Sequence, residues 1–376
     1  MSIPRAGASA PAFLFFALNL ADGDGREVRR GFGCDAGRTQ KYAGYPLTLS
    51  AKIYRGTPVN LRRLSCVLQR GGLVAVPTET VYGLAANALN ASACRQIFRA
   101  KRRPANDPLI VHVADLQMLA QVAVSNEAVT KLARAFWPGP LTLVLPRKPG
   151  IPDVVTSGLP SVAVRMPAHR LLRRLLRLCR LPLAAPSANP FGYVSPTTAA
   201  HVRDGLGSAI AHILDGGPCL HGLESTIVDI RDPRQPVLLR PGVITAKQLA
   251  QVLGVPVRVG PANRKVGIPV VAPGQLDRHY SPLRPLRTHR RISASMVARA
   301  RSDDAWVCFR KPAWAGAAKN VFWLSKLGNV NEAGCHLFAL LRRLDRGPWT
   351  RLHAELAPPD GPGLAINDRL RRAAAK

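Results

Sequence analysis

Paired cysteines are missing from this chain. Its seven cysteines stand singly, at positions 34, 66, 94, 179, 219, 308 and 335, and no C-x-x-C occurs. A zinc ribbon and a disulfide framework are therefore not expected, and isolated thiols are typical of a reducing, cytoplasmic compartment. A run of about 18 apolar residues, the length that spans a bilayer, is also missing, so the sequence predicts no membrane-spanning helix.

Acidic residues are scarce. The chain has 22 Asp and Glu against 53 Lys and Arg, a net charge of +31. The excess is +18 over residues 51–282 and +11 over residues 283–376, so it is not confined to a basic tail. Such a field attracts polyanions, either nucleotide phosphates or RNA. An arginine-rich proteome from a high-GC genome would give the same excess, and charge alone does not separate the two explanations.

The first 50 residues form a separate segment. An apolar patch from Phe13 to Leu20 follows Arg5, as in a poor signal peptide, but it is short and lacks a convincing cleavage site. We expect this extension to be disordered, or translation to start near residues 47–53 at a non-AUG codon. Intact-mass measurement of protein made from the native gene tests this, because a mass that includes residues 1–50 excludes the later start.

Hydrophobic periodicity and turn residues predict a mixed α/β domain over residues 51–254. Helices are expected over residues 57–70, 90–102, 125–136 (capped by Ser125), 169–180, 197–204 and 245–253 (capped by Thr245). Strands are expected over residues 73–76, 109–113, 141–145, 162–165, 182–185, 210–214, 225–230 and 236–240. Because strands and helices do not alternate strictly, we expect one large twisted mixed sheet with flanking helices.

Two further segments follow. Residues 255–282 are rich in Pro and Gly, which is typical of a linker. Residues 283–376 contain apolar strands near 306–309 and 321–324 and a helix near 332–344, so we expect a smaller α/β domain.

Polar side chains follow the first strand of the large domain. The stretch GGLVAVPTETVYGL breaks at Pro77 into Thr78, Glu79 and Thr80. Hydroxyls and a carboxylate at the carboxyl end of a strand lie where α/β folds bind ligands. A plain strand-to-loop turn explains the stretch equally well when it is taken alone.

Basic residues stand where other elements end. Lys101 and Arg103 close a helix, where they suit the helix dipole, but once the helix opens towards Pro104 both can also reach a phosphate. Arg165 and Arg240 each end an apolar strand. A single strand-end arginine often pairs with a carboxylate, whereas several in a chain poor in acids favour an anion site.

A Ser–x–Asn motif supplies small polar groups. Ser187 and Asn189 leave a strand and enter a Pro/Gly loop that runs to Ser195. Hydroxyls and amides donate to phosphate oxygens without bulk, although an ordinary Asn-Pro turn has the same composition. His112, which alternates with Ile110 along a strand, is typical of a hydrogen-bonded core histidine.

Five stretches together resemble one family. PTETVYGL, KRRP with PLIVHV, SVAVRMP, APSANPFGYVSP, and LESTIVD with LLRPG match, in order, the pattern of the YrdC-like threonylcarbamoyl-AMP synthases. The linker APGQLDRHYSP and the ending GPGLAINDRLRRAA resemble the longer, two-domain form. The resemblance implies a YrdC-like mixed sheet and a smaller Rossmann-like domain, with residues 255–282 as a linker or lid.

The resemblance also implies site residues. Lys101 and Arg103 would be catalytic. ATP would contact Arg103, Asp107, Ser161, Ser187, Asn189, Ser195, Arg240 and Tyr280. L-threonine would contact Thr80, His112, Arg165, Ala185 and Ser225. One departure stands out, because the family usually has Asp-Asn where this chain has Asn106-Asp107, and a carboxylate beside a triphosphate is repulsive unless Mg²⁺ bridges it.

The implied reaction joins L-threonine, bicarbonate or CO₂, and ATP into threonylcarbamoyl-AMP and pyrophosphate. Mg²⁺ would accompany ATP, no dedicated metal site is expected, and a tRNA threonylcarbamoyl transferase complex would receive the product. Direct contact with RNA is left open. An RNA-binding module without synthase activity is the alternative, whereas a hydrogenase-maturation carbamoyltransferase would carry paired-cysteine zinc fingers, which this chain lacks.

Overall fold

The computed structural model describes residues 51–260, 271–274, 279–316 and 318–375. The predicted N-terminal extension, 1–50, lies outside the described residues, as do residues 261–270 and 275–278 of the predicted linker. The start near residues 47–53 therefore stays a prediction. Within the described part of the chain, no helix is long and apolar enough to cross a membrane.

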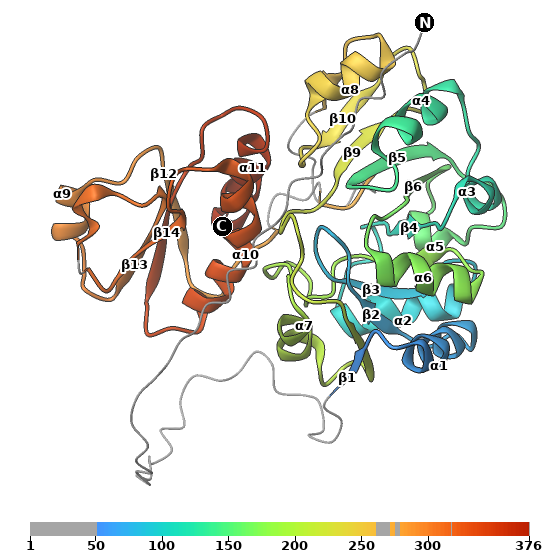
Figure 1. The fold of residues 1–376 in the computed structure, drawn as a ribbon, viewed down its shortest axis with the longest axis horizontal. Coiled ribbons are helices and arrows are strands. Elements are labelled where there is room, and N and C mark those ends of the chain that lie inside the picture. The colour runs from blue at the N-terminus through green and yellow to red at the C-terminus, as the bar shows by residue number, and fades with distance from the viewer. Residues whose placement is uncertain (1–50, 261–270, 275–278, 317, 376) are drawn as a thin grey trace, which may run out of the picture. The chain divides into compact units, whose positions relative to one another are not determined.

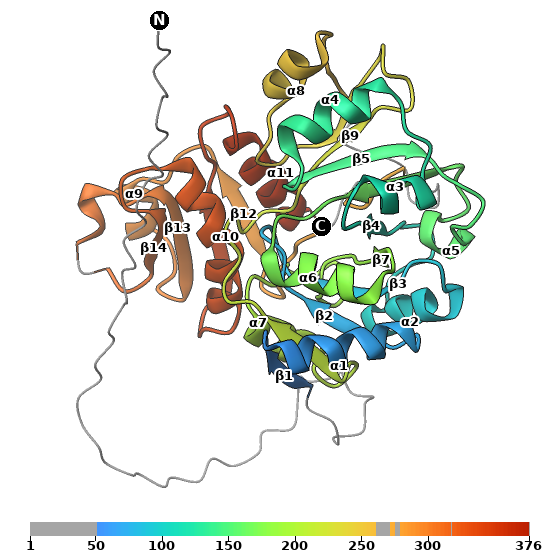
Figure 2. The ribbon, with the colours of Figure 1, turned by 45° about the vertical axis from the view of Figure 1, so that its right-hand side comes forward.

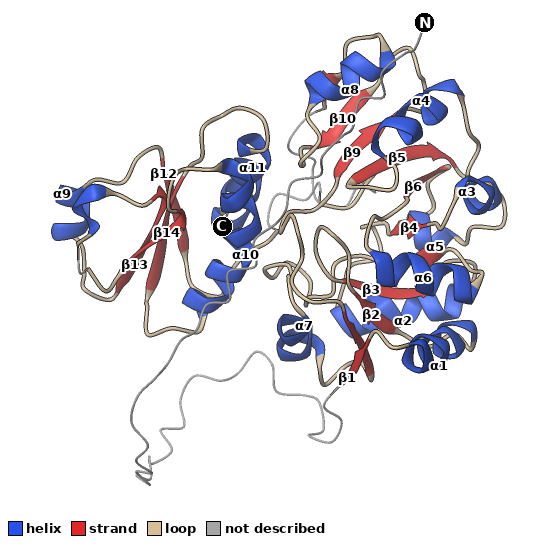
Figure 3. Cartoon of the chain, in the orientation of Figure 1, coloured by secondary structure: helices blue, strands red, loops and turns tan. Residues whose placement is uncertain are grey.

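A large mixed sheet organises the first domain (Figures 1 and 3). Its strand order is β1-β8-β2-β3-β7-β4-β6-β5-β9-β10-β11. The strands are β1 (Lys52–Arg55), β2 (Val74–Val76), β3 (Gly83–Asn87), β4 (Ile110–His112), β5 (Leu141–Pro146), β6 (Ser161–Arg165), β7 (Leu183–Ala184), β8 (His212–Asp215), β9 (Thr226–Asp229), β10 (Val237–Arg240) and β11 (Arg258–Val259). The expected mixed sheet is confirmed.

Helices flank this sheet, and α1 packs against α6 (Figure 2). They are α1 (Pro58–Gln69), α2 (Ala91–Lys101), α3 (Leu116–Val122), α4 (Glu127–Phe136), α5 (Asp153–Thr156), α6 (Arg170–Cys179), α7 (Ala199–Leu206) and α8 (Ala246–Leu253). Fully buried Leu64, Leu68, Leu175 and Leu176 from α1 and α6 belong to one hydrophobic core with the strands.

Local capping chemistry explains where several helices begin. Thr245 caps α8 with a complete capping box, as predicted from its position before the apolar run. The cap of α4 was predicted wrongly: Asn126, and not Ser125, accepts the N–H of Val129, at 3.2 Å. Both residues are good caps, and the structure uses the one that also donates to the carbonyl of Ile230, at 2.8 Å.

Strand register places polar side chains side by side at the centre of the sheet. β4 and β6 are parallel, with His112 opposite Arg165, and β5 brings Thr142 opposite Arg165 from the other side. β10 ends at Arg240, beyond a register shift against β9. Side chains that lie far apart in the sequence therefore meet at the same end of these strands.

The second domain is a four-stranded parallel sheet of order β12-β15-β13-β14. Its strands are β12 (Leu286–His289), β13 (Asp304–Arg310), β14 (Val321–Ser325) and β15 (Arg351–Glu355). Helices α10 (Val330–Asp345) and α11 (Gly363–Ala374) pack on one face, while α9 (Ala294–Ala298) and the short helix η1 (Ala313–Ala315) cover the other (Figure 1). This arrangement confirms the Rossmann-like expectation.

The large sheet extends past the predicted domain boundary. β11 pairs in parallel with β10, so residues 258 and 259 belong to the first sheet rather than to the linker predicted from residue 255. The linker therefore begins later in the sequence than its Pro and Gly content indicated.

Candidate functional site

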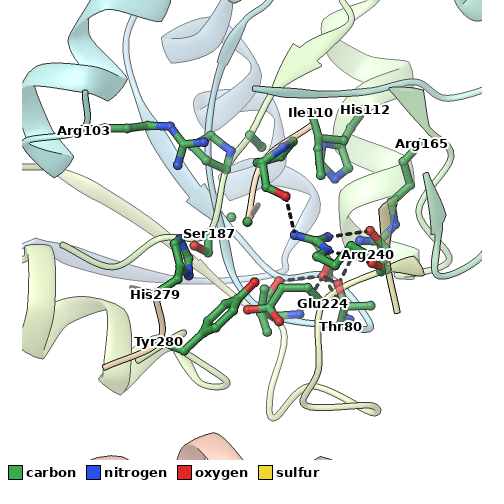
Figure 4. Close-up of a pocket in the computed structure, with 18 residues that line it drawn as sticks. Thr80, Arg103, Ile110, His112, Arg165, Ser187, Glu224, Arg240, His279 and Tyr280 are labelled. Carbon is green, nitrogen blue, oxygen red and sulfur yellow. Dashed lines mark hydrogen bonds between the residues drawn. The ribbon is translucent and has the colours of Figure 1, made fainter. Parts of the chain in front are cut away.

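A buried cavity of about 50 Å³ lies where β4, β6 and β10 end beside the loop after β2 (Figure 4). Nine of the site residues implied by the resemblance line it: Thr80, Arg103, His112, Arg165, Ala185, Ser187, Ser225, Arg240 and Tyr280. Three of them are arginines, and Glu224 is the one acid among the lining residues. The cavity therefore presents a positive, hydroxyl-rich surface.

Arg165 is held by the loop that follows β2. Its Nη2 lies 2.5 Å from Oε1 of Glu79, and its Nη1 donates to Oγ1 of Thr80, at 2.9 Å. Burial raises the pKa of Glu79, but the charge and hydrogen bond of Arg165 outweigh it and leave that pKa below its usual value. Arg165 therefore has a carboxylate partner, although the scarcity of acids in the sequence predicted none.

Thr78 shapes the same loop. Its Oγ1 accepts the N–H groups of Thr80 and Val81, at 3.0 and 3.1 Å, and lies 2.7 Å from the hydroxyl of Thr80. A threonine that bonds to backbone two and three residues onward makes a tight polar turn. The Thr-Glu-Thr sequence is thus both a turn and the support of a cavity-lining hydroxyl.

Arg240 aims the hydroxyl of Ser225. The Nε and Nη2 atoms of Arg240 donate to the carbonyl oxygen and Oγ of Ser225, both at 3.1 Å. Thr142 lies 2.7 Å from the same Oγ. No carboxylate pairs with Arg240 among the described residues, so this buried guanidinium is the least neutralised cation of the cavity.

Arg103 has a carboxylate partner. Helix α2 ends at Lys101, and Arg102 adopts the left-handed conformation (φ 54°), which turns Arg103 out of the helix and into the cavity wall. Its Nη2 lies 2.9 Å from Oδ2 of Asp107, an ion contact without hydrogen-bond alignment. The carboxylate left by the Asn106-Asp107 order therefore contacts Arg103.

Lys101 stands behind the wall and does not line the cavity. Its Nζ donates to the carbonyl of Ser187, at 2.5 Å, and to that of Asn189. Burial and the nearby charge of Arg103 hold the pKa of Lys101 well below its usual value. In this geometry Lys101 braces the Ser187–Asn189 loop from behind.

Four more predicted residues also lie outside the cavity lining: Asp107, Ser161, Asn189 and Ser195. Asn189 donates to the carbonyls of Pro190 and Tyr193, at 2.9 and 2.8 Å, so it holds its own loop in shape. Ser195 donates to Oε1 of Glu224, at 2.5 Å. Ser161 is buried on β6 and its hydroxyl has no partner among the described residues.

His112 lines the cavity as a neutral imidazole. Burial, with a smaller contribution from Arg165, lowers its pKa to about 3. Its Nδ1 is buried and has no hydrogen-bond partner among the described residues. A neutral ring with an unused nitrogen can exchange a hydrogen bond with a ligand without adding charge.

Tyr280 enters the cavity from the linker. It is buried, has φ of 63°, and stacks on Phe338 of α10 at a centroid distance of 5.6 Å. A non-glycine residue in the left-handed region is strained and persists only where its surroundings impose it. Gly274, with φ of +77°, lies so close that an added Cβ would stand 2.8 Å from the Tyr280 hydroxyl.

Two arginines of the second domain, which sequence reasoning missed, reach the loops behind the cavity. Nε of Arg369 on α11 lies 2.9 Å from Oε2 of Glu224, and its guanidinium lies over the Tyr280 ring, 5.3 Å from the centroid. Arg342 on α10 donates to the carbonyls of Val194 and Ser195, at 2.7 and 3.3 Å. The one signal in the sequence was the tail that resembles the two-domain form.

The described residues hold no cluster of three His, Cys, Asp or Glu side chains that could bind a metal. Glu224, the one acid of the cavity lining, already accepts from Ser195 and Arg369 through its two oxygens. Mg²⁺ commonly binds through substrate phosphates plus one or two carboxylates. These side chains therefore fit a magnesium ion that arrives on a nucleotide better than a resident ion.

Comparisons with known proteins identify relatives over most of the chain. The Sua5/YciO/YrdC family model, described as "Telomere recombination", matches residues 66–242. A model described as "Threonylcarbamoyl-AMP synthase, C-terminal domain" matches residues 244–375. The threonylcarbamoyl-AMP synthase of Pyrococcus abyssi is 41% identical over 81% of this chain and 91% of its own length. That of Bacillus subtilis is 39% identical over 84% of this chain and 92% of its own length.

Two solved structures are also similar to this chain over most of its length. The crystal structure of P. abyssi Sua5 complexed with L-threonine superposes with a TM-score of 0.79 at 38% identity, covering 86% of this chain and 98% of the other. A second P. abyssi Sua5 structure, in which an adjacent histidine and tyrosine are replaced by alanine, gives a TM-score of 0.78 at 38% identity, covering 86% of this chain and 96% of the other. This chain carries one such dipeptide, His279-Tyr280. The chain therefore belongs to the threonylcarbamoyl-AMP synthase family, in its two-domain form.

Proposed function

We propose that the protein makes threonylcarbamoyl-AMP and pyrophosphate from L-threonine, bicarbonate or CO₂, and ATP. The observation that carries this proposal is the cavity itself, which three arginines line together with the hydroxyls of Thr80, Ser187 and Ser225. Cations and hydroxyls in one buried space suit a carboxylate and phosphates at the same time.

The chemistry needs no covalent enzyme intermediate. The threonine amine adds to CO₂ and loses a proton, which gives a carbamate. A carbamate oxygen then attacks the α-phosphorus of ATP, the bond from that phosphorus to the bridging oxygen breaks, and pyrophosphate leaves. Arg103 and Arg240 would stabilise phosphate charge, and Lys101 would hold the Ser187–Asn189 loop in place to bind the nucleotide.

L-threonine would lie against β4 and β6. Arg165 uses three of its five N–H groups on Glu79, Thr80 and Gly139, so two remain for the amino acid's carboxylate. The unpaired Nδ1 of His112 and the hydroxyl of Ser225 would contact its polar groups. Ala185 adds a small side chain to the wall.

ATP would need more room than the cavity offers in this conformation. Ligand sites commonly measure about 300–1,000 Å³, whereas this cavity holds about 50 Å³ with Tyr280 and Gly274 in its wall. Tyr280 would therefore shift to admit the nucleotide and return over it. Mg²⁺ would enter as the ATP complex, and Asp107, Ser161, Asn189 and Ser195 would support the nucleotide from behind the lining.

The product would pass to a tRNA threonylcarbamoyl transferase complex, and a cytoplasmic site of action follows from that acceptor. The activated carbamate is a mixed anhydride that water cleaves, so a buried site protects it until transfer. The burial of Arg103, Arg165 and Arg240 supports such protection.

The test is pyrophosphate release from Mg·ATP with bicarbonate, with and without L-threonine. We expect release that requires threonine and is poor with serine. Lys101→Ala combined with Arg103→Ala should lower turnover by a factor of about 10² or more while the fold is retained by circular dichroism. Wild-type turnover in this double variant contradicts the site assignment, and no threonine-dependent release from the folded wild type contradicts the function.

An RNA-binding module without synthase activity is the second candidate, favoured by the net charge of +31. Such a protein would lose RNA affinity steeply with salt and would not depend on Thr80, Arg165 or Ser225. A threonine requirement for pyrophosphate release excludes it as the whole function.

A further inference from the structure

An open cavity of about 760 Å³ lies at the carboxyl edge of the small parallel sheet, away from the residues described above. It is formed by the segments that follow all four strands of that sheet. Arg291 comes after β12, Arg310 ends β13, Lys326 follows β14, and Glu355 ends β15. The short helix η1 adds Trp314.

The connections of this sheet make that edge a favourable place for a ligand. From β13 the chain continues to the outer neighbour β14, whereas β15, on the other side of β13, continues to α11, which packs beside β12. Adjacent strands whose connections leave in opposite directions open a crevice at their carboxyl ends, where open α/β sheets bind ligands.

The crevice is strongly positive. Arg291, Arg310, Lys311 and Lys326 all line it with exposed side chains, and Glu355 is the one acid among the lining residues. None of these four cations forms an ion pair with another described residue. Solvent-exposed cations without acidic partners create a field that attracts phosphates.

Aromatic rings accompany the cations. Trp314 lines the crevice and Trp323 stands on β14 nearby, each 36% exposed, and Nζ of Lys311 lies 4.9 Å from the Trp323 ring centroid. Basic side chains interleaved with exposed aromatic rings are the combination on which single-stranded nucleic acids stack their bases.

We propose that this crevice, lined by Arg291, Arg310, Lys311, Trp314, Lys326 and Glu355, binds a single-stranded segment of RNA. The cations would take successive phosphates, Trp314 would stack on one base, and Glu355 would accept from a base amino group or a ribose hydroxyl. The proposal rests on the proposed function, because the threonylcarbamoyl group is destined for an RNA.

A chain of nucleotides fits better than a free nucleotide. Arg291 and Lys326 follow the two outer strands of a four-stranded sheet, so the cations extend over three strand spacings, about 14 Å. All four side chains are exposed, and the residues that line the crevice include no buried cation around which a single phosphate would bind. A row of separate surface charges neutralises a polymer backbone more effectively than a single anion.

The experiment measures RNA binding by fluorescence anisotropy of a labelled single-stranded oligoribonucleotide over a range of salt. The crevice variant carries Arg310→Ala, Lys311→Ala and Lys326→Ala. The matched control carries Arg62→Ala, Arg174→Ala and Arg177→Ala, which remove the same charge from exposed helix positions of the first domain. We expect the crevice variant to bind at least about tenfold more weakly and to lose about two units of salt slope, whereas the control binds like the wild type.

Further measurements distinguish binding of a single strand in the crevice from binding of a duplex, of a free nucleotide or at other charged surfaces. Trp314→Ala should weaken binding of the oligoribonucleotide more than binding of a blunt RNA duplex, because a duplex offers no free base to stack. Equal losses in the crevice and control variants overturn the proposal, as does displacement of RNA by uridine monophosphate at equal nucleotide concentration. Threonine-dependent pyrophosphate release without RNA should be unchanged in the crevice variant, so failure of RNA binding and failure of the synthase are distinguishable.

Discussion

Arg369, on the last helix, lies with its Nε 2.9 Å from Oε2 of Glu224, whose other oxygen accepts the hydroxyl of Ser195. All three side chains are buried. The second domain therefore fixes an acid in the wall of the arginine-lined cavity of the first. An acid held in this way stabilises one arrangement of the Ser225 segment, on which the Arg240 contacts depend.

Replacing Arg369 by Met should lower the free energy of unfolding by about 3–5 kcal/mol, because Glu224 would stay buried without a cation. Threonine-dependent turnover should fall with it. Arg369→Lys should recover part of both. Denaturant unfolding and pyrophosphate release are the measurements.

A double-mutant cycle isolates this ion pair. Glu224→Gln combined with Arg369→Met should cost less than the sum of the two single changes, since the second change removes a partner that is already lost. Additive costs would show that the two residues act independently and would contradict the pairing.

Arg165→Lys should raise the KM for threonine by about tenfold or more. Lysine cannot maintain contacts to Glu79 and Thr80 while presenting two further N–H groups to a carboxylate. Arg231→Lys, the same change in an exposed ion pair with Asp229, is the control and should leave the KM unchanged. A larger effect on the KM for ATP than for threonine would contradict the assignment.

Gly274→Ala should reduce turnover more than Gly254→Ala. Both glycines have nearly the same φ, +77° and +76°, so the backbone strain of an alanine is matched. An alanine at 274 would also stand 2.8 Å from the Tyr280 hydroxyl and 3.1 Å from Nη1 of Arg240, whereas at 254 it meets open space. Steady-state kinetics distinguishes the two, and equal losses would mean that contact with Tyr280 has no role.

The stability of the protein should depend on His112 below neutral pH. Its folded pKa is lowered to about 3 from an ordinary value of 6.5, so between these values the unfolded chain binds a proton that the folded chain does not. The contribution of His112 to the free energy of unfolding is therefore fully present above pH 6.5. It decreases as the pH falls towards 3, by up to about 1.4 kcal/mol per pH unit.

His112→Asn should flatten that acid slope. Measured unfolding free energies from pH 4 to 7 should show a shallower decline in the variant than in the wild type. His201, whose pKa is lowered to about 4, titrates in the same window and is unchanged in both proteins, so only the difference of slopes is compared. Identical slopes in the variant and the wild type would show that His112 is not the group whose protonation destabilises the folded protein.

Elements with local signals could be predicted from the sequence. The caps Thr57, Asn90 and Thr245 stand before the helices they begin, and the apolar strands that end at Arg165 and Arg240 are continuous runs. β3 was missed because its sequence, GLAAN, lacks β-branched and aromatic residues, and pairing with β2 and β7 decides its conformation.

Contacts between distant residues could not be predicted. Glu79 is 86 residues from Arg165, and Glu224 is 145 residues from Arg369, so no spacing rule connects either pair. The small number of acids in the sequence indicated unpaired arginines. In the fold, however, two of the three cavity arginines, Arg103 and Arg165, each contact a carboxylate. The resemblance of the motifs identified nine residues that line the cavity. Their hydrogen bonds could not be predicted in the same way, because they depend on tertiary packing.

The same separation sets an order of events on the ribosome. Glu224 leaves the peptidyl-transferase centre 145 residues before Arg369, an interval on the order of 10 s at common elongation rates. During that interval the nascent first domain can acquire its sheet, but the wall of its cavity lacks the arginine that fixes Glu224. The ion pair between Glu224 and Arg369 can therefore form only after the C-terminal helix has been synthesised.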